Sequence, residues 1–399
     1  MSSQKNSTVH GPRPVDFPRD PLYIRESVGI MTRLNPPFRA EHVGSLLRPR
    51  RLKDAARARQ KGEIPPSVYG EILDLEIERV VRLQESVGLH SITDGEFSRS
   101  SWFGFFFERL KGFTLQPSLF RFHGSNGHDQ EWMTCYASDR MRREQAICVD
   151  DFERLNALTN ETAKANMPSP SALHFFRGEQ CRDADVYPDM QTWWDDLIRI
   201  YQAEILELSR AGCRYLQLDE VPLAMLCDSD IRQQVVGIGA DPDDLARRYV
   251  AATNEALKAR PPEMTVGMHL CRGNFRSRWM AEGGYEPVAE RLFNDTDVDV
   301  FFLEYDSPRA GDFSPLRYLA DNKSVVLGLI TSKSPGLEDA TALKRRIDEA
   351  AEYVPMERLA ISPQCGFASV AGGNALSEEQ QMRKLELVVD VARDVWGDS

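Results

Sequence analysis

The chain has 399 residues, of which 42% are hydrophobic and 28% are charged, a composition typical of a soluble globular protein. Its formal net charge of −12 argues against nucleic acid or an anionic membrane as the main partner, because both require a basic face. No apolar run approaches the roughly 18 residues needed to span a bilayer. The length fits two average domains or one large α/β barrel.

The N-terminal segment, residues 1–37, is polar and contains Ser, Pro and Arg, without the basic-then-apolar order of a secretory signal. We interpret it as an arm that precedes a single domain of residues 38–399, and we expect a cytoplasmic protein. The seven cysteines are odd in number and scattered, unlike a disulfide framework. We expect most of them to be reduced and buried.

From residue 38 onward, a short apolar run, a turn and a helical pattern recur as a unit. The sequence predicts eight strands, at residues 38–43, 89–93, 165–167, 214–218, 265–270, 298–303, 324–330 and 359–361. It predicts its clearest helices at residues 71–86, 192–209, 249–257, 339–353 and 378–396. Alternating strands and helices indicate a parallel sheet, and eight strands indicate a single (β/α)8 TIM barrel. An open doubly wound sheet is the alternative.

The interval between the second and third predicted strands, residues 98–164, is longer than one helix requires. We expect an excursion that covers the barrel mouth. Its aromatic run at residues 102–107 either packs beneath this excursion or stacks on a flat donor molecule, which makes Trp102 and Phe105 candidates for a donor pocket. A loop-like segment with His123 and His128 follows, and solvated histidines are its simplest interpretation.

Polar and small residues follow several predicted strands, at the barrel end where functional groups gather. They include Ser45, Glu96, Asp219, His269, Cys271, Glu304 and Cys365. His269 and Cys271 are two residues apart on one predicted strand, so their side chains project from the same face.

His269, Cys271, Glu304 and Cys365 offer one imidazole, two thiolates and one carboxylate, a set suited to zinc. Donors from three separate strands suit a site at the mouth of a scaffold better than a local structural staple. Zinc at such a site acts as a Lewis acid and keeps a bound thiol as thiolate. The alternative is that these are ordinary core residues, because a His and a Cys two apart form a short, common string.

Several segments together resemble cobalamin-independent methionine synthase. His269-Leu270-Cys271, Glu304 after an apolar strand, and Ser362-Pro363-Gln364-Cys365-Gly366 resemble its zinc motifs. The segments Arg39–Pro49, Thr93–Glu96 and Leu216–Pro222 fit the same family. The resemblance implies a (β/α)8 barrel in which His269, Cys271, Glu304 and Cys365 bind Zn²⁺. It also implies that zinc activates a small thiol, homocysteine first, for attack on a methyl donor.

The resemblance also implies roles around the substrate. Glu96 and Asp219 correspond to the carboxylates that hold the homocysteine amino group, while the Gly44-Ser45 turn would meet its carboxylate. Strand-end capping is the plainer interpretation of both acids. His42 is either a proton donor or substrate contact or a structural histidine. His174 has apolar neighbours in the sequence and is a candidate for the wall of the donor pocket or for the core.

The sequence departs from the family in ways that leave the donor open. We expect the short single-barrel branch, which includes epoxyalkane:coenzyme M transferases, and Phe97–Phe105 is aromatic where this branch is arginine-rich. The alternatives are epoxide opening with coenzyme M, demethylation of a methoxyarene or sulfonium compound, and a zinc- or thiol-binding protein without turnover. Arg99, Arg272 or Arg276 in the pocket would favour a sulfonate thiol. A homo-oligomer and a separate methyl-donor protein also stay open.

Overall fold

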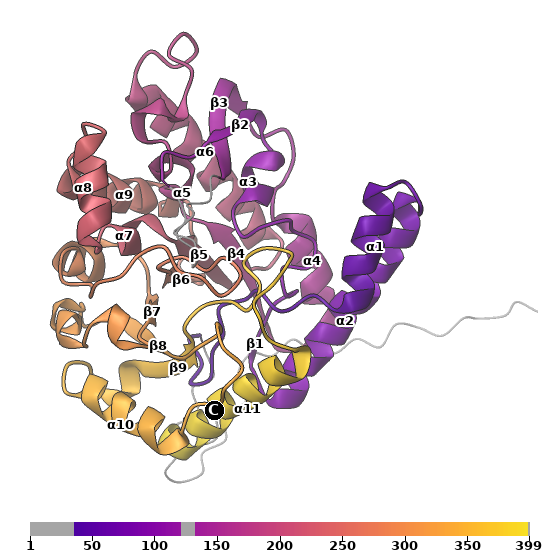
Figure 1. The fold of residues 1–399 in the computed structure, drawn as a ribbon, viewed down its shortest axis with the longest axis vertical. Helices are drawn as coiled ribbons and strands as arrows, with labels where there is room; N and C mark the ends of the chain where they lie inside the picture. Colours follow the sequence, from indigo (N-terminus) through magenta and orange to yellow (C-terminus); the bar gives the residue numbers. More distant parts are fainter. Residues whose placement is uncertain (1–35, 121–131, 398–399) are drawn as a thin grey trace, which may run out of the picture. The chain divides into compact units, whose positions relative to one another are not determined.

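A computed structural model describes residues 36–120 and 132–397 of the chain. Most of the predicted arm and the loop with His123 and His128 lie outside these ranges, so the expected domain boundary stays a prediction. Seven parallel strands form one sheet in the order β1-β4-β5-β6-β7-β8-β9 (Figure 1). Among the helices of the described residues, none combines the length and apolar composition needed to cross a bilayer.

The strands of this sheet lie at or close to seven of the eight predicted positions. Their bounds are β1 Ser91–Ile92, β4 Thr162–Pro168, β5 Tyr215–Glu220, β6 Thr265–Leu270, β7 Val300–Glu304, β8 Ser324–Ile330 and β9 Leu359–Pro363. Nearly every residue in them is buried, as expected for a parallel sheet covered on both faces. All seven cysteines are buried and free, as the sequence predicted.

The remaining predicted strand, which is the first in the chain (residues 38–43), is an irregular segment that nevertheless closes the barrel. Ala40 pairs in parallel with Ile361 of β9. The Glu41 amide donates to the Ile361 carbonyl at 2.9 Å, and the Ile361 amide donates to the Arg39 carbonyl at 2.9 Å. The predicted (β/α)8 barrel is therefore confirmed, with the correction that its first strand is reduced to a single bridge.

Side chains make the contacts between this first segment and β1, which explains why no regular ladder forms there. The Ser91 hydroxyl donates to the Glu41 carboxylate at 2.6 Å, and the Thr93 hydroxyl donates to the Gly44 carbonyl at 2.7 Å. Backbone pairing is thus replaced by hydroxyl donors on this side.

Helices lie around the outside of the strands in Figure 1. Their bounds are α1 Arg50–Gln60, α2 Pro66–Val87, α3 Gly104–Glu108, α4 Val149–Leu158, α5 Ala172–Phe175, α6 Met190–Arg210, α7 Pro222–Met225, α8 Ser229–Gly237, α9 Pro242–Leu257, α10 Ala340–Ala351 and α11 Glu378–Trp396. α11 matches its predicted bounds, because Ser377 and Gln380 form a capping box at its start and Gly397 ends it.

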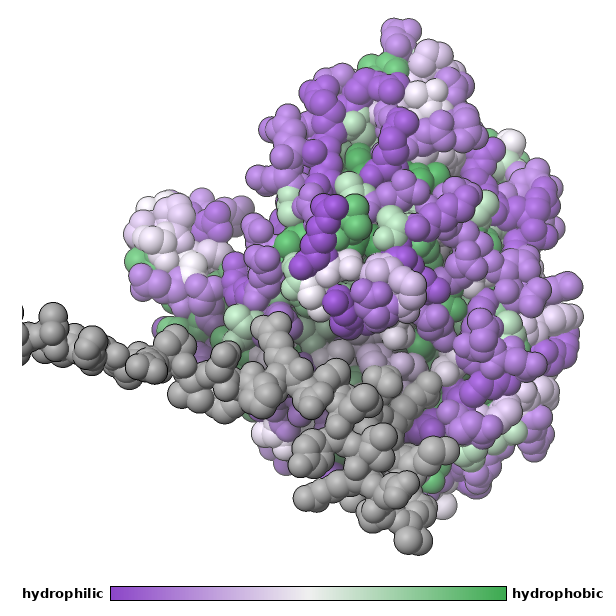
Figure 2. All heavy atoms as spheres, turned by 180° about the vertical axis from the view of Figure 1, so that it is seen from behind, coloured by the Kyte–Doolittle hydropathy of each residue, from purple (hydrophilic) through white to green (hydrophobic). Residues whose placement is uncertain are grey.

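The expected excursion contains an antiparallel hairpin of β2 (Lys111–Pro117) and β3 (Met133–Arg142), flanked by α3 and α4. Trp132, just before β3, and Met133, its first residue, line the cavity that contains most of the predicted site residues, which we call the main cavity, so the hairpin borders the barrel mouth. The surface in Figure 2 is mainly hydrophilic, with apolar side chains visible between polar ones. The predicted homo-oligomer stays untested.

Candidate active site

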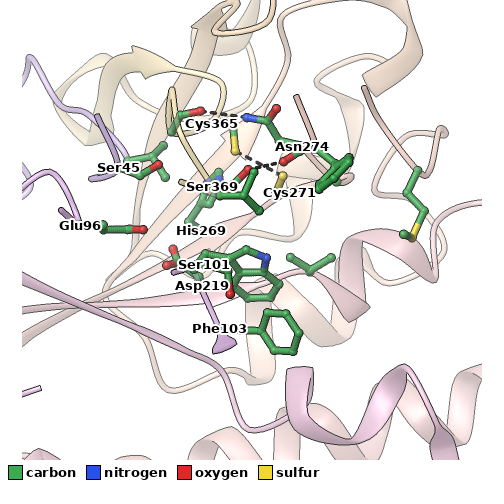
Figure 3. Close-up of a pocket in the computed structure, with 18 of the residues that line it drawn as sticks. Ser45, Glu96, Ser101, Phe103, Asp219, His269, Cys271, Asn274, Cys365 and Ser369 are labelled. Atoms are coloured by element: carbon green, nitrogen blue, oxygen red, sulfur yellow. Dashed lines mark hydrogen bonds between the residues drawn. The ribbon is translucent and has the colours of Figure 1, made fainter. Parts of the chain in front are cut away.

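The main cavity has a volume of about 230 Å³ and lies where the barrel strands end. Glu96 follows β1, Asp219 belongs to β5, and His269 belongs to β6. Cys271 and Cys365 follow β6 and β9 (Figure 3). The parallel strands thus deliver groups that are far apart in sequence to one space, as (β/α)8 barrels do.

His269, Cys271 and Cys365 form a compact group of potential metal ligands. One donor atom from each lies within 4.8 Å of the others, and the two sulfurs are 3.4 Å apart (Figure 3). Donor atoms in a tetrahedral zinc site are roughly 3.5–3.8 Å apart. Both nitrogens of the buried His269 ring lack a hydrogen bond of good geometry, which is unusual for buried polar atoms. The donor set and the unpartnered imidazole therefore fit zinc.

The sulfurs of this group differ in acidity. A hydrogen bond from Cys271 lowers the pKa of Cys365 well below its usual value despite burial, and His269 and Lys333 lower it further. The same hydrogen bond, together with burial, raises the pKa of Cys271. One thiolate is therefore already favoured by the protein, and a bound cation would favour the second.

Glu304, the predicted fourth ligand, is not part of this three-residue group in the described structure. Its carboxylate accepts a hydrogen bond from the Arg272 amide at 3.0 Å, lies 3.4 Å from the Lys333 ammonium, and pairs with Arg309. Burial would raise the pKa of Glu304, but Lys333, Arg272 and Arg309 together lower it to about 2. The carboxylate is thus ionised and held by cations.

Glu96 is a buried acid with an unusual backbone. Its φ is 60°, in the left-handed region, and its amide is bound by the Asp94 carboxylate at 2.8 Å. Burial raises the pKa of Glu96 to about 8, against the opposing charges of Arg99 and Arg48 and with help from Asp219. One of its carboxylate oxygens is buried without a partner, so the site has an unused acceptor.

Asp219 faces the same cavity, and burial raises its pKa to about 6 although the charge of His269 opposes the shift. The Gln217 amide group orients it with a hydrogen bond of 2.8 Å. Glu220 points away, accepting bonds from Ser171 and from the Leu223 amide at 2.9 Å. Two neighbouring acids on β5 thus face opposite sides, as the strand period requires.

The Gly44-Ser45 turn is packed closely beside the cysteine group. Gly44 has a φ of 130°, and a Cβ there would come within 2.3 Å of the Asn166 side-chain nitrogen. A Cβ at Gly366 would meet the Ser45 hydroxyl at 1.9 Å. Ser45 lines the cavity, whereas Gly44 shapes the turn behind it.

Three other candidates do not line the cavity in the described structure. His42 bonds to the Ser91 carbonyl at 2.9 Å, and burial, with Lys164, lowers its pKa to about 3. His174 is buried, 3.0 Å from the Tyr249 hydroxyl, and borders a separate small cavity. Phe105 lies under Arg99, while Trp102 does line the main cavity. Of the histidine and aromatic candidates His42, His174, Phe105 and Trp102, all in the described part of the chain, Trp102 is the one that lines the main cavity.

Other cavity residues escaped sequence analysis. Apart from Phe103, which the predicted aromatic run at residues 102–107 includes, they are chiefly Trp132, Phe176, Met225, Asn274 and Met280. They come from loops and short helices, where neither periodicity nor a motif marks them. Lys333 and Arg309, which hold Glu304, were missed for the same reason. Arg99, Arg272 and Arg276 are not among the lining residues.

Comparisons with known proteins identify the family of this chain. The family model of the cobalamin-independent synthase catalytic domain matches residues 38–394. The uncharacterized protein YxjH of Bacillus subtilis is 40% identical over 366 residues, covering 90% of this chain and 95% of that protein. The methionine synthase of Pyrococcus furiosus is 26% identical, covering 82% of this chain and 85% of that protein.

A crystal structure from Listeria monocytogenes, described as that of the "putative vitamin-B12 independent methionine synthase", matches with a TM-score of 0.70 and 36% identity. The match covers 90% of this chain and 98% of that one. The chain therefore belongs to the family of cobalamin-independent synthase catalytic domains, and is a methyltransferase of that family.

Proposed function

We propose that this protein is a zinc-dependent methyltransferase that transfers a methyl group to the thiol of homocysteine. The observation that carries the proposal is that one cavity contains both a group of potential zinc ligands and two buried acids, Glu96 and Asp219. His269, Cys271 and Cys365 would hold the zinc ion. When bound there, zinc supplies the Lewis acidity that keeps a substrate thiol ionised near neutral pH.

The two buried acids of the cavity indicate which other functional group the thiol substrate has. Glu96 and Asp219 would bind an ammonium group, for which Glu96 already has an unpartnered oxygen. The lining formed by described residues contains no arginine or lysine, so an anionic group such as a sulfonate has no charged partner there. A volume of about 230 Å³ suits a small amino acid. These features favour homocysteine over coenzyme M.

The remaining residues orient the substrate. The Gly44-Ser45 turn would present backbone N–H groups to the homocysteine carboxylate. Three His/Cys donors leave one position of a tetrahedral site for the substrate thiol. Glu304 would complete the site only when its carboxylate leaves Lys333 and Arg309.

Metal content tests the site assignment. Wild-type protein is expected to bind about one zinc ion per chain, and Cys271→Ser and Cys365→Ser are expected to lose most of it while keeping wild-type circular dichroism. Cys213→Ser is the matched control, because Cys213 is also buried but lies outside the group of potential ligands and donates to the Tyr215 carbonyl at 3.3 Å. Zinc retained by both site variants would show that the assignment is wrong.

Thiol specificity tests the substrate. Zinc-loaded protein is titrated with homocysteine, coenzyme M and glutathione, and methylated product is counted per enzyme chain. Tightest binding of homocysteine and many turnovers support the proposal. Preference for another thiol keeps the mechanism and discards the substrate, whereas binding without turnover with any methyl donor identifies a zinc- or thiol-binding protein.

A further inference from the structure

Four aromatic side chains form a continuous surface in the main cavity, which we call the aromatic wall: Trp102, Phe103, Trp132 and Phe176. Ring centroids are 5.0 Å apart for Trp102 and Phe103 and 5.8 Å apart for Phe103 and Trp132. Trp132 and Phe176 are in edge-to-face contact at 4.5 Å. Segments before α3, before β3 and after α5 meet to build this wall, in the cavity that also holds the cysteines (Figure 3).

The cavity is built to attract positive charge. Among the described lining residues, Glu96 and Asp219 are the acids and none is a lysine or arginine, although the charge of Arg99, which does not line the cavity, acts on both acids. The guanidinium groups nearest in sequence are turned to other rings: Arg99 is 4.0 Å from the Phe105 centroid and Arg276 is 5.5 Å from the Phe275 centroid. Aromatic faces attract cations through their quadrupoles, so the aromatic wall and the two acids both favour a positively charged ligand.

Among the described residues that line the cavity beside the aromatic wall, none carries a general acid that could protonate a leaving group. The polar side chains near it that line the cavity are Ser101, Ser369 and Asn274. The Asn274 amide is engaged with the Gly366 carbonyl at 2.9 Å, and Ser369 with the Asn274 carbonyl. Glu96, the acid with the raised pKa, would be occupied by the substrate ammonium. The site therefore disfavours a methyl donor whose leaving atom must gain a proton when the methyl group departs.

We propose that the methyl donor is a methylsulfonium compound whose charged sulfur packs on the aromatic wall. The inference rests on the proposed methylation of a thiol. The substrate thiolate sulfur attacks the methyl carbon and forms a new C–S bond, while the sulfonium C–S bond breaks and its electron pair stays on the departing sulfur. The donor leaves as a neutral thioether, and the only proton released is the one that the thiol loses to solvent on ionisation.

Binding of a bare cation tests the wall separately from turnover. Trimethylsulfonium carries no ammonium or carboxylate, and dimethyl sulfide is its uncharged counterpart. Calorimetry on zinc-loaded wild-type protein is expected to show binding of the cation and much weaker binding of the sulfide. Trp102→Leu and Trp132→Leu should each weaken cation binding about 2- to 30-fold, whereas Trp102→Phe should retain most of it. Wild-type affinity in both leucine variants, with circular dichroism unchanged, would overturn the wall as the binding site.

Turnover distinguishes the donor from the acceptor. Trimethylsulfonium with homocysteine is expected to yield methionine and dimethyl sulfide in equal amounts. Methyl transfer from the sulfonium to coenzyme M or glutathione but not to homocysteine would support the donor and refute the proposed thiol. Methionine formed from 5-methyltetrahydrofolate or choline, with none from the sulfonium, would support the thiol and overturn the donor. Absence of both sulfonium binding and transfer would overturn the inference.

Discussion

Glu96 combines two features that are costly unless a ligand uses them. A left-handed backbone at a non-glycine residue costs on the order of 1 kcal/mol, and a buried carboxylate oxygen without a partner adds to that cost. Both features become useful if an ammonium group binds, because the strained turn then aims a fully desolvated acceptor at it. The proposed ammonium ligand would account for this conformation.

We predict that binding of methionine to zinc-loaded protein releases close to one proton at pH 7. The pKa of Glu96 is about 8 in the free protein, so the group is largely neutral at pH 7, and a bound ammonium favours its ionised form. Affinity should therefore rise between pH 6 and pH 8, by at most about tenfold per unit. Calorimetry in two buffers of different ionisation enthalpy measures the number of protons released on binding. Methionine is used because it has no thiol whose ionisation would add to that number.

Glu96→Gln should abolish this proton release and weaken methionine binding about 10- to 100-fold, because a charged hydrogen bond is worth roughly 1.5–3 kcal/mol. Glu63→Gln, at an exposed position, is the control. Unchanged proton release in the Glu96 variant would show that another group titrates on binding.

Gly44 permits a second test at this scale. Gly44→Ala is expected to lower the free energy of unfolding by about 2–4 kcal/mol, because its φ of 130° is strained for alanine and its Cβ would lie 2.3 Å from the Asn166 side-chain nitrogen. Gly62→Ala isolates the backbone cost, since Gly62 has a φ of 73° and no atom within 4 Å of an added Cβ. Equal losses in the two variants, measured by urea unfolding, would mean that Asn166 moves aside freely.

At the scale of elements, α11 holds the turn that would meet the substrate carboxylate. The Gln381 side chain accepts a hydrogen bond from the Leu47 amide at 2.7 Å, and both groups are buried. Gln381→Met should leave that amide unsatisfied and destabilise the protein by about 1–3 kcal/mol in urea unfolding. Glu386→Met, on an exposed position of the same helix, should stay within about 0.5 kcal/mol of wild type.

The sequence predicts those elements best whose signals are local. β6 and β8 keep their predicted bounds because each is a short, mostly apolar and mostly buried run, and α11 keeps its bounds because a cap and a glycine delimit it. The first strand is predicted but irregular: it pairs with β9 through one bridge, and toward β1 it is contacted by the Ser91 and Thr93 hydroxyls, whose use the sequence does not reveal.

In the site, too, the sequence predicts residues that local signals mark and misses residues that only the folded chain brings together. The His269, Cys271 and Cys365 group follows from strand-end positions and the family resemblance, and the structure brings the three side chains together. Glu304 occupies the expected strand end, yet its partners Lys333 and Arg309 come from loops that no periodicity marks. Of the aromatic wall, the sequence predicted Trp102 and Phe103 through the aromatic run at residues 102–107, whereas Trp132 and Phe176 converge from other loops after the chain has folded.

For the molecule as a whole, barrel closure depends on a buried ion pair. The Lys164 ammonium lies 3.2 Å from the Glu41 carboxylate, and both side chains are 0% exposed. The Tyr215 hydroxyl donates to the same carboxylate at 2.9 Å. The pair sits beside an apolar interior layer formed by Tyr215, Val300, Phe302, Val326 and Ala360. It therefore ties the irregular first segment to β4 across a region of low dielectric.

We predict that Lys164→Met lowers the free energy of unfolding by about 3–5 kcal/mol, because it leaves the Glu41 charge buried without a counterion. The double variant Glu41→Gln/Lys164→Met removes both charges and should recover a large part of that loss, since an ion pair itself adds little net stability once both desolvation costs are counted. Urea unfolding of the two single variants and the double variant gives the coupling free energy directly. A double variant as unstable as Lys164→Met would show that polar contacts of Glu41 with Ser91 and Tyr215, rather than charge compensation, hold the first segment in the barrel.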